Sequence, residues 1–257
     1  MAGGIPQPDE PLYVYTRGRP KALLEVAGRP MVHWIVAALD QAASIRRIVV
    51  SGLTNVEPPL RAGKPLSFVP DQHSMLGNVQ AGVAQLAKEG ELAKYVLLVS
   101  ADIPTISPAI VDWSVNTSLE SDHEGYYSLI PRDKMEARFP GSKRSYFYFK
   151  DGVFTGSDLN LVAANLVMAG HSMAPALFEA RKSIFKQAAL IGFDVLLLFA
   201  LRQLTVADAA RLVSQRLKIK GRALICPYPE AGMDVDKPAQ YEMVKRDLEA
   251  RVARGGA

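Results

Sequence analysis

Two kinds of hydrophobic pattern alternate along this chain. Short apolar or β-branched runs predict strands, and they lie at residues 46–52, 66–70, 95–101, 125–131, 145–150 and 222–227. The stretches between several of these runs have apolar residues at helical spacing, which is typical of amphipathic helices. This alternation predicts a three-layer α/β/α fold, Rossmann-like, around a mostly parallel mixed sheet.

Helix boundaries can be predicted from capping residues. The expected starts are Pro30 for a helix over 30–43, Ser74 for one ending at Gly90, Thr205 with Asp208, and Asp236 with Pro238. Residues 132–160 are rich in charge, glycine and aromatic side chains, which predicts an elaborated hairpin region. Because no repeat, low-complexity tract or long linker interrupts the chain, we expect residues 1–257 to form a single domain.

Composition excludes some classes of protein. The formal net charge of +4 fits anionic small ligands as well as nucleic acid. The single cysteine, Cys226, excludes an intramolecular disulfide and a cysteine-rich zinc site. The longest apolar run, residues 195–201, is too short to cross a bilayer, and the N-terminus has no signal segment. We therefore expect a cytoplasmic protein without a membrane or nucleic-acid partner. A homo-oligomer is compatible with the sequence.

The N-terminal residues carry the first candidate chemistry. Ala2-Gly3-Gly4 is followed by Arg17, Arg19 and Lys21. Backbone N–H groups without side chains, together with flexible cations, suit the binding of a triphosphate. Such a loop needs a buried strand before it and a helix after it. The sequence supplies the helix at 30–43, but no strand precedes the glycine pair.

Two later segments of the chain carry acidic residues with candidate chemistry. Asp102 ends the apolar run of "YVLLVSADIPTISP", at the edge of the sheet where open α/β proteins bind ligands. A carboxylate there could hold Mg²⁺ against phosphate oxygens, or it could cap the following turn. Asp234 and Asp236 are two residues apart, so both could point at one cation. Asp236 could equally be a helix N-cap before Pro238.

Taken in order, the stretches "AGG", "RPKALLEVAGRPM", "ADIP" and "DVDKPAQ" resemble the nucleotidyltransferases of the GT-A-like fold. This group includes molybdenum-cofactor guanylyltransferase-like and sugar-phosphate nucleotidyltransferase proteins. The resemblance implies a nucleotide site and a metal site. The implied nucleotide-binding residues are Ala2, Gly3, Gly4, Arg17, Lys21 and Asn78; the catalytic residues are Lys21, Asp102 and Arg19; and Asp102 and Asp236 hold Mg²⁺.

The chain departs from this group in three respects. The group has a central strand before its glycine pair, so we expect the first strand to be missing and hypothesise that Met1 is an internal methionine of a longer protein. The loop before Arg17 is long, and the group's arginine could match Arg17 or Arg19. Gln240 replaces a trailing aspartate, which should affect helix capping more than chemistry.

Other matches to the group are looser. Asn78 lies at a helix start, where these enzymes hold the base or the acceptor, although a capped surface helix explains it equally well. The resemblance places acceptor recognition around Lys143, Arg144, Asp158 and Asn160. Solvated loop charges are the alternative for these residues.

The implied activity is Mg²⁺-dependent transfer of a nucleoside monophosphate from an NTP to a phosphorylated small-molecule acceptor, with release of pyrophosphate. The acceptor itself attacks the α-phosphorus, so the protein contributes positioning and electrostatics. One alternative is a GT-A glycosyltransferase that uses a nucleotide-sugar, although no D-x-D follows a mid-chain strand. Another is a non-catalytic nucleotide-binding or regulatory protein.

Overall fold

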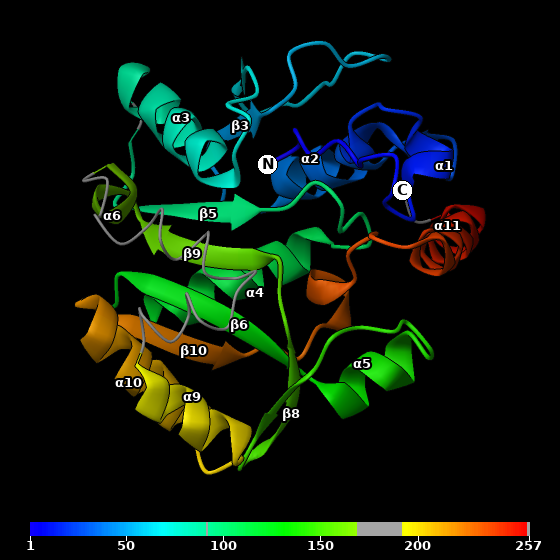
Figure 1. Ribbon diagram of the computed structural model, residues 1–257. Coiled ribbons are helices and arrows are strands. Elements are labelled where there is room, and N and C mark those ends of the chain that lie inside the picture. Colours follow the sequence, from blue (N-terminus) through cyan, green and yellow to red (C-terminus); the bar gives the residue numbers. More distant parts are fainter. Residues whose placement is uncertain (91, 169–191, 256–257) are drawn as a thin grey trace.

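A mixed sheet runs through the molecule with helices on both faces (Figure 1). The computed structural model describes residues 1–90, 92–168 and 192–255. Its strands are β1 (Glu25–Val26), β2 (Arg29–Pro30), β3 (Ile48–Ser51), β4 (Leu66–Val69), β5 (Tyr95–Val99), β6 (Gly125–Pro131), β7 (Phe147–Phe149), β8 (Gly152–Gly156), β9 (Leu159–Ala163) and β10 (Gly221–Ile225). All six predicted strands are present.

The largest sheet has the order β5-β9-β6-β8-β7, with β10 paired to β6. β10 runs parallel to β6, and β3 runs parallel to β4 in a separate pair. β9 lies antiparallel between β5 and β6, and β8 is antiparallel to β6. The prediction of a mixed sheet is confirmed. The expected predominance of parallel strands is wrong for the described residues, because in the largest sheet β10 and β6 are parallel whereas the pairs that β7, β8 and β9 form are antiparallel. No strand was predicted at β8 or β9. Both lie in the stretch "GVFTGSDLNLVA", where glycines interrupt the apolar pattern that marks a strand.

Helices pack on opposite faces of this sheet. The helical elements are α1 (Tyr13–Thr16), η1 (Lys21–Leu23), α2 (Met31–Gln41), α3 (Met75–Lys88), α4 (Pro108–Leu119), α5 (Arg132–Arg138), α6 (Ala164–Met168), α9 (Phe193–Ala200), α10 (Val206–Leu217), η2 (Pro229–Gly232) and α11 (Pro238–Ala253). Val115 of α4 packs with Tyr126 of β6, whereas Val206 of α10 packs with Leu129 of the same strand. Residues 126 and 129 point to opposite faces, so the three-layer arrangement is confirmed.

Capping explains several helix starts. The Ser74 side chain accepts a hydrogen bond from the Gly77 N–H, and Thr205 and Asp208 form a capping box. Asp236 does not cap α11: the N-cap position is Lys237, and Gln240 accepts the N–H groups of both Asp236 and Lys237. The interpretation of Asp236 as an N-cap is therefore wrong, because the N-cap position falls on Lys237 and the Asp236 side chain pairs with Lys21 instead.

The first residues join the largest sheet to the pair of β3 and β4. The Met1 amino group donates to the Val99 carbonyl at 2.8 Å, and the Ala2 N–H donates to the Ser51 carbonyl at 2.7 Å. In the space between β3 and β5 the described residues place no further strand, since β3 pairs with β4 and β5 pairs with β9. A cavity of about 200 Å³ lies there, closed by apolar side chains of α2 and α3. Met1 and Ala2 also line this cavity, and the hypothesis of a strand before them stays a prediction.

The helices that the structure describes include none with the length and apolar content of a membrane span.

Candidate active site

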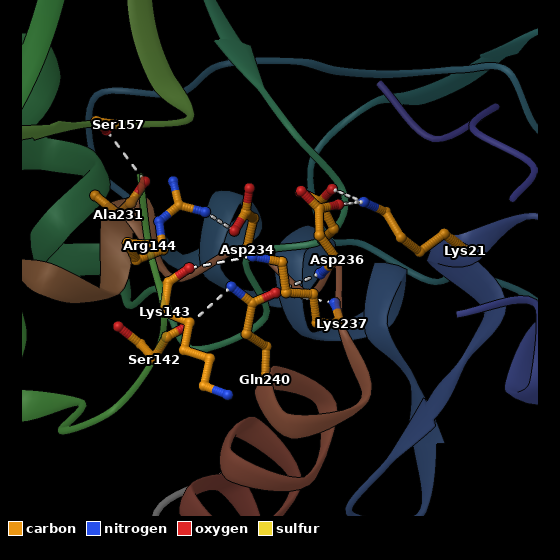
Figure 2. Close-up of polar contacts among 11 residues, drawn as sticks. Lys21, Ser142, Lys143, Arg144, Ser157, Ala231, Asp234, Asp236, Lys237 and Gln240 are labelled. Carbon is orange, nitrogen blue, oxygen red and sulfur yellow. Dashed lines mark hydrogen bonds and ion pairs between the residues drawn. The ribbon is translucent and has the colours of Figure 1, made fainter. Parts of the chain in front are cut away.

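Two acidic side chains from distant parts of the chain contact one lysine. The Lys21 Nζ lies 2.5 Å from the Asp102 Oδ2 and 2.5 Å from the Asp236 Oδ1 (Figure 2 shows Lys21 and Asp236). Lys21 and Asp102 are largely buried, with side-chain exposures of 18% and 13%, whereas Asp236 is 53% exposed. The predicted convergence of residues 102 and 236 is thus present in the structure.

Backbone contacts build this arrangement. Asp102 follows β5, and its carbonyl accepts a hydrogen bond from the Val235 N–H at 3.0 Å. The Val235 side chain is fully buried, which anchors the segment that carries Asp234 and Asp236. Lys21 begins η1, and its N–H donates to the Gly4 carbonyl at 2.8 Å. The lysine is therefore fixed to the glycine pair at one end and to the two acids at the other.

The electrostatics of the cluster favour a cation among the carboxylates. Burial would lower the pKa of Lys21, but the charges of Asp102 and Asp236 outweigh it and raise this pKa above its usual value. Burial, followed by the charge of Asp102, raises the pKa of Asp158 to about 7. Repulsion by Asp236 adds to this rise, while Arg144 and Lys21 oppose it. A further positive charge at this place would therefore be stabilised by three acidic side chains.

The glycine pair lies beside this cluster. A Cβ atom at Gly3 would meet the Asp71 Oδ1 at 2.6 Å and the Gly52 Cα at 3.0 Å, whereas none of the described residues has an atom within 4 Å of a Cβ at Gly4. Ala2, Gly3, Gly4 and Lys21 line an open cavity of about 840 Å³. The same cavity is lined by Asp71, Asn78, Asp102, Asp158, Asp234 and Asp236. The cavity is large enough for a nucleotide.

The two acids of the "DVD" segment contact different cations. Asp234 forms an ion pair with Arg144, and Asp236 pairs with Lys21 (Figure 2). The idea that residues 234 and 236 point together at one cation is therefore wrong for this structure. Arg144 and Asp234 are both largely buried, with exposures of 12% and 14%.

Other predicted residues lie outside the cavity or already have partners. Arg17 and Arg19 are exposed and do not line the cavity; the Arg19 Nε instead lies 3.4 Å from the Thr16 carbonyl of its own loop. Lys143 is exposed, and its carbonyl accepts the Lys237 ammonium. The Asn160 side chain bonds to the backbone of Ser128 and Ser157.

Asn78 lines the cavity, but its amide is engaged within the protein. Its Nδ2 donates to the Asp71 Oδ1 at 2.8 Å, and its Oδ1 accepts from the Gln72 N–H at 2.9 Å. Asp71 lines the cavity directly beside Gly3 and was not predicted from the sequence. Its position just after β4 was the available signal, since ligands bind where such strands end.

The fold and this cluster define an α/β protein with a nucleotide-sized, acid-lined cavity at one edge of its sheet. The profile of the MobA-like NTP transferase domain family matches residues 16–189. The chain belongs to this family and is an enzyme of the nucleotidyltransferase class.

Solved structures agree with this assignment. A hypothetical transferase from Thermus thermophilus is 29% identical, with a TM-score of 0.79 over 94% of this chain and 96% of that one. CMP:2-keto-3-deoxy-manno-octonic acid synthetase complexed with CTP is 14% identical, with a TM-score of 0.57 over 91% and 92%. The 4-diphosphocytidyl-2C-methyl-D-erythritol synthase from Anaerococcus prevotii is 11% identical, with a TM-score of 0.56 over 89% and 93%. The last two share the fold alone. A comparison with curated protein sequences finds no significant match.

Proposed function

We propose that this enzyme transfers a nucleoside monophosphate from an NTP to a phosphorylated small molecule, and that it requires Mg²⁺. The observation that carries the proposal is the contact of Asp102 and Asp236 with one cation, Lys21, beside the open Gly4 backbone. Transfer of a nucleoside monophosphate from a triphosphate needs both positive charge and unobstructed backbone at one place, and this edge of the sheet supplies both.

The residues fit a magnesium ion whose remaining ligands come from water and substrate. Among the described residues, no group of three Asp, Glu, His or Cys side chains could hold a metal without other ligands. The Asp102 Oδ1 is buried without a hydrogen-bond partner, and it belongs to one of the two converging carboxylates. Mg²⁺ is commonly bound by one or two carboxylates plus substrate phosphates, which matches Asp102 and Asp236. When bound, Mg²⁺ would neutralise negative charge on the phosphates.

In the proposed reaction, the side chains of the site have separate roles. Lys21, whose raised pKa keeps it charged, holds the β- and γ-phosphates of the NTP. An oxygen of the acceptor phosphate attacks the α-phosphorus, the bond from that phosphorus to the bridging oxygen breaks, and pyrophosphate leaves with both bonding electrons. We infer that Arg144, which pairs with the cavity-lining Asp234, balances the charge of an anionic acceptor. Neither Arg17 nor Arg19 is required by this geometry, and both stay predictions.

Pyrophosphate release tests the proposal directly. The protein should release pyrophosphate from one NTP only when Mg²⁺ and a phosphorylated sugar or alditol are both present. CTP and GTP are the first nucleotides to test, because fold neighbours are named for cytidine compounds and the family is MobA-like. A thermal-shift screen would select the pair, since a ligand that binds only the native state raises its stability. Nucleotide binding without turnover for every acceptor tested would contradict the proposed reaction.

A further inference from the structure

A buried glutamine connects two parts of the site. Gln240, in the first turn of α11, is 2% exposed. Its Oε1 accepts hydrogen bonds from the Asp236 N–H and the Lys237 N–H, both at 2.9 Å. Its Nε2 donates to the Ser142 carbonyl at 3.1 Å (Figure 2). One side chain therefore contacts two segments that are about a hundred residues apart in sequence.

Each end of this amide meets a different element of the site. The oxygen end holds the backbone of Asp236, whose side chain contacts Lys21. The nitrogen end holds residues 142–144, which carry Arg144 to its ion pair with Asp234. The Lys237 Nζ donates to the next carbonyl of the same segment, that of Lys143, at 3.2 Å. The first turn of α11 thus binds two consecutive carbonyls of the segment 142–144.

Helix capping alone does not explain an amide at this position. A capping box needs only an acceptor oxygen at the third helical residue, and glutamate supplies one as well as glutamine. The Gln240 Nε2 contributes nothing to the cap, because it donates to the distant Ser142. A buried hydrogen bond between an amide donor and a backbone carbonyl fixes the distance between the two segments. Leaving a buried carbonyl unpaired would cost free energy.

We propose that Gln240 is a positioning residue: its oxygen places the metal-holding Asp236, and its nitrogen places segment 142–144 with the acceptor-side Arg144. This inference rests on the proposed function, which assigns Asp236 and Arg144 to those two ligands. It differs from the expectation that Gln240 affects helix capping more than chemistry. The two halves of the amide act on different sides of the site, so they can be separated by mutation.

Two substitutions separate the two halves. Gln240→Glu keeps an acceptor for the Asp236 and Lys237 N–H groups but has no N–H for Ser142. Gln240→Leu removes both bonds. Backbone hydrogen exchange at residues 142–144 measures the nitrogen half, and the affinity for Mn²⁺ added alone, followed by its paramagnetic resonance, measures the oxygen half.

We expect exchange at residues 142–144 to rise about tenfold or more in both variants, because the segment loses a bond that restrains its opening. Mn²⁺ affinity should stay within about threefold of wild type in Gln240→Glu and fall about tenfold in Gln240→Leu, as is common when the support of a metal ligand is removed. If Gln240→Glu binds Mn²⁺ normally while its backbone hydrogen exchange at residues 142–144 stays fast, a general loss of stability cannot explain the result.

Matched controls separate this effect from charge and stability. Gln215→Glu makes the same change of charge at an exposed position of α10. Leu217→Ala, at a residue 2% exposed on the same helix, lowers stability away from the site. Neither control should alter exchange at 142–144 selectively or weaken Mn²⁺ binding.

Two results would overturn the proposal: unchanged exchange at 142–144 in Gln240→Glu, or wild-type Mn²⁺ affinity in a folded Gln240→Leu. If Gln240→Leu does not fold, Gln240→Glu still tests the nitrogen half. A wild-type protein that binds no Mn²⁺ would contradict the metal assignment in the proposed function and the role given to the oxygen half. The exchange experiment would still decide whether Gln240 fixes segment 142–144.

Discussion

The two backbone segments that border the cavity are held in different ways. The segment 234–237 is fixed by side chains: Val235 is buried, Asp234 and Asp236 have ion-pair partners, and Gln240 accepts two of its N–H groups. The segment 2–4 is fixed by close backbone contact. Gly3 lies against Gly52 and Asp71 with no room for a side chain, and Gly4 faces open space.

This difference matches what each segment is proposed to hold. A small divalent ion requires its ligands at fixed distances, so carboxylates must be restrained by several partners. A triphosphate is long and charged along its length, so exposed N–H groups on an unobstructed backbone suit it better than side chains. Lys21 connects the two segments, because its N–H bonds to Gly4 and its ammonium contacts Asp236.

The largest effect should come from the acidic side. Asp102→Asn keeps the shape of the side chain but removes one of the two proposed metal ligands, so kcat for pyrophosphate release should fall about a thousandfold. The fold should persist, as measured by circular dichroism and unfolding midpoint. Asp122→Asn is the control, since Asp122 is 78% exposed and distant from the cavity. Undiminished activity in Asp102→Asn would rule out its assignment as a metal ligand.

The residue that connects the two segments should have the next largest effect. Lys21→Met removes the positive charge between Asp102 and Asp236, so activity should fall about a hundredfold. Without metal, the free energy of unfolding should fall by about 2 kcal/mol, because two neighbouring carboxylates lose their counter-charge. Added Mg²⁺ should then raise the melting temperature of Lys21→Met more than that of wild type, since no ammonium competes. An equal rise in both proteins would show that Lys21 and the ion do not share a place.

The glycine segment can be tested with a matched pair. In Gly3→Ala the new methyl group would meet Asp71 and Gly52, so the unfolding midpoint should fall. Gly4→Ala has space for its methyl group and should leave the unfolding midpoint unchanged. If the nucleotide passes over Gly4, however, Gly4→Ala should raise the KM for NTP about tenfold. A wild-type KM in Gly4→Ala would place the nucleotide elsewhere in the cavity.

The smallest effect concerns Asp158 and pH. Its folded pKa of about 7 lies above the ordinary value of 3.8, so the charged form destabilises the fold as pH rises through this interval. Asp158→Asn should therefore be more stable than wild type above pH 7 in metal-free buffer, and the difference should vanish below pH 4. Chemical unfolding at several pH values measures this. A variant that is less stable at high pH would contradict the proposed burial cost.

Particular elements show why some predictions from sequence succeeded. The strand at 125–131 has the predicted bounds because its apolar run is clearly delimited. Ser74 and Thr205 cap their helices as expected, since capping depends on neighbouring residues only. By contrast, β9 joins β5 to β6 through pairing across the sheet, which no local pattern in "LNLVA" reveals.

The candidate site shows the same difference between features set by local sequence and features set by long-range contacts. Lys21, Asp102 and Asp236 were found because each lies beside a recognisable turn or strand end. Asp71 was not predicted, whereas Asp158 lines the same cavity as Asp102, and its role on the acceptor side stays a prediction. The partners of Arg144 and Gln240 could not be predicted, because they lie about ninety or more residues away in sequence.

The sequence alone determined the alternation of strands and helices, the caps, and the residue types able to bind phosphate and a cation, because these depend on local spacing and chemistry. Only the tertiary structure decided which acid contacts which cation. The hydrogen bond from Val235 to Asp102 brings residues 102 and 236 together, and the buried amide of Gln240 joins that segment to residues 142–144. Such contacts arise from the packing of distant segments, and packing is a property of the folded chain as a whole.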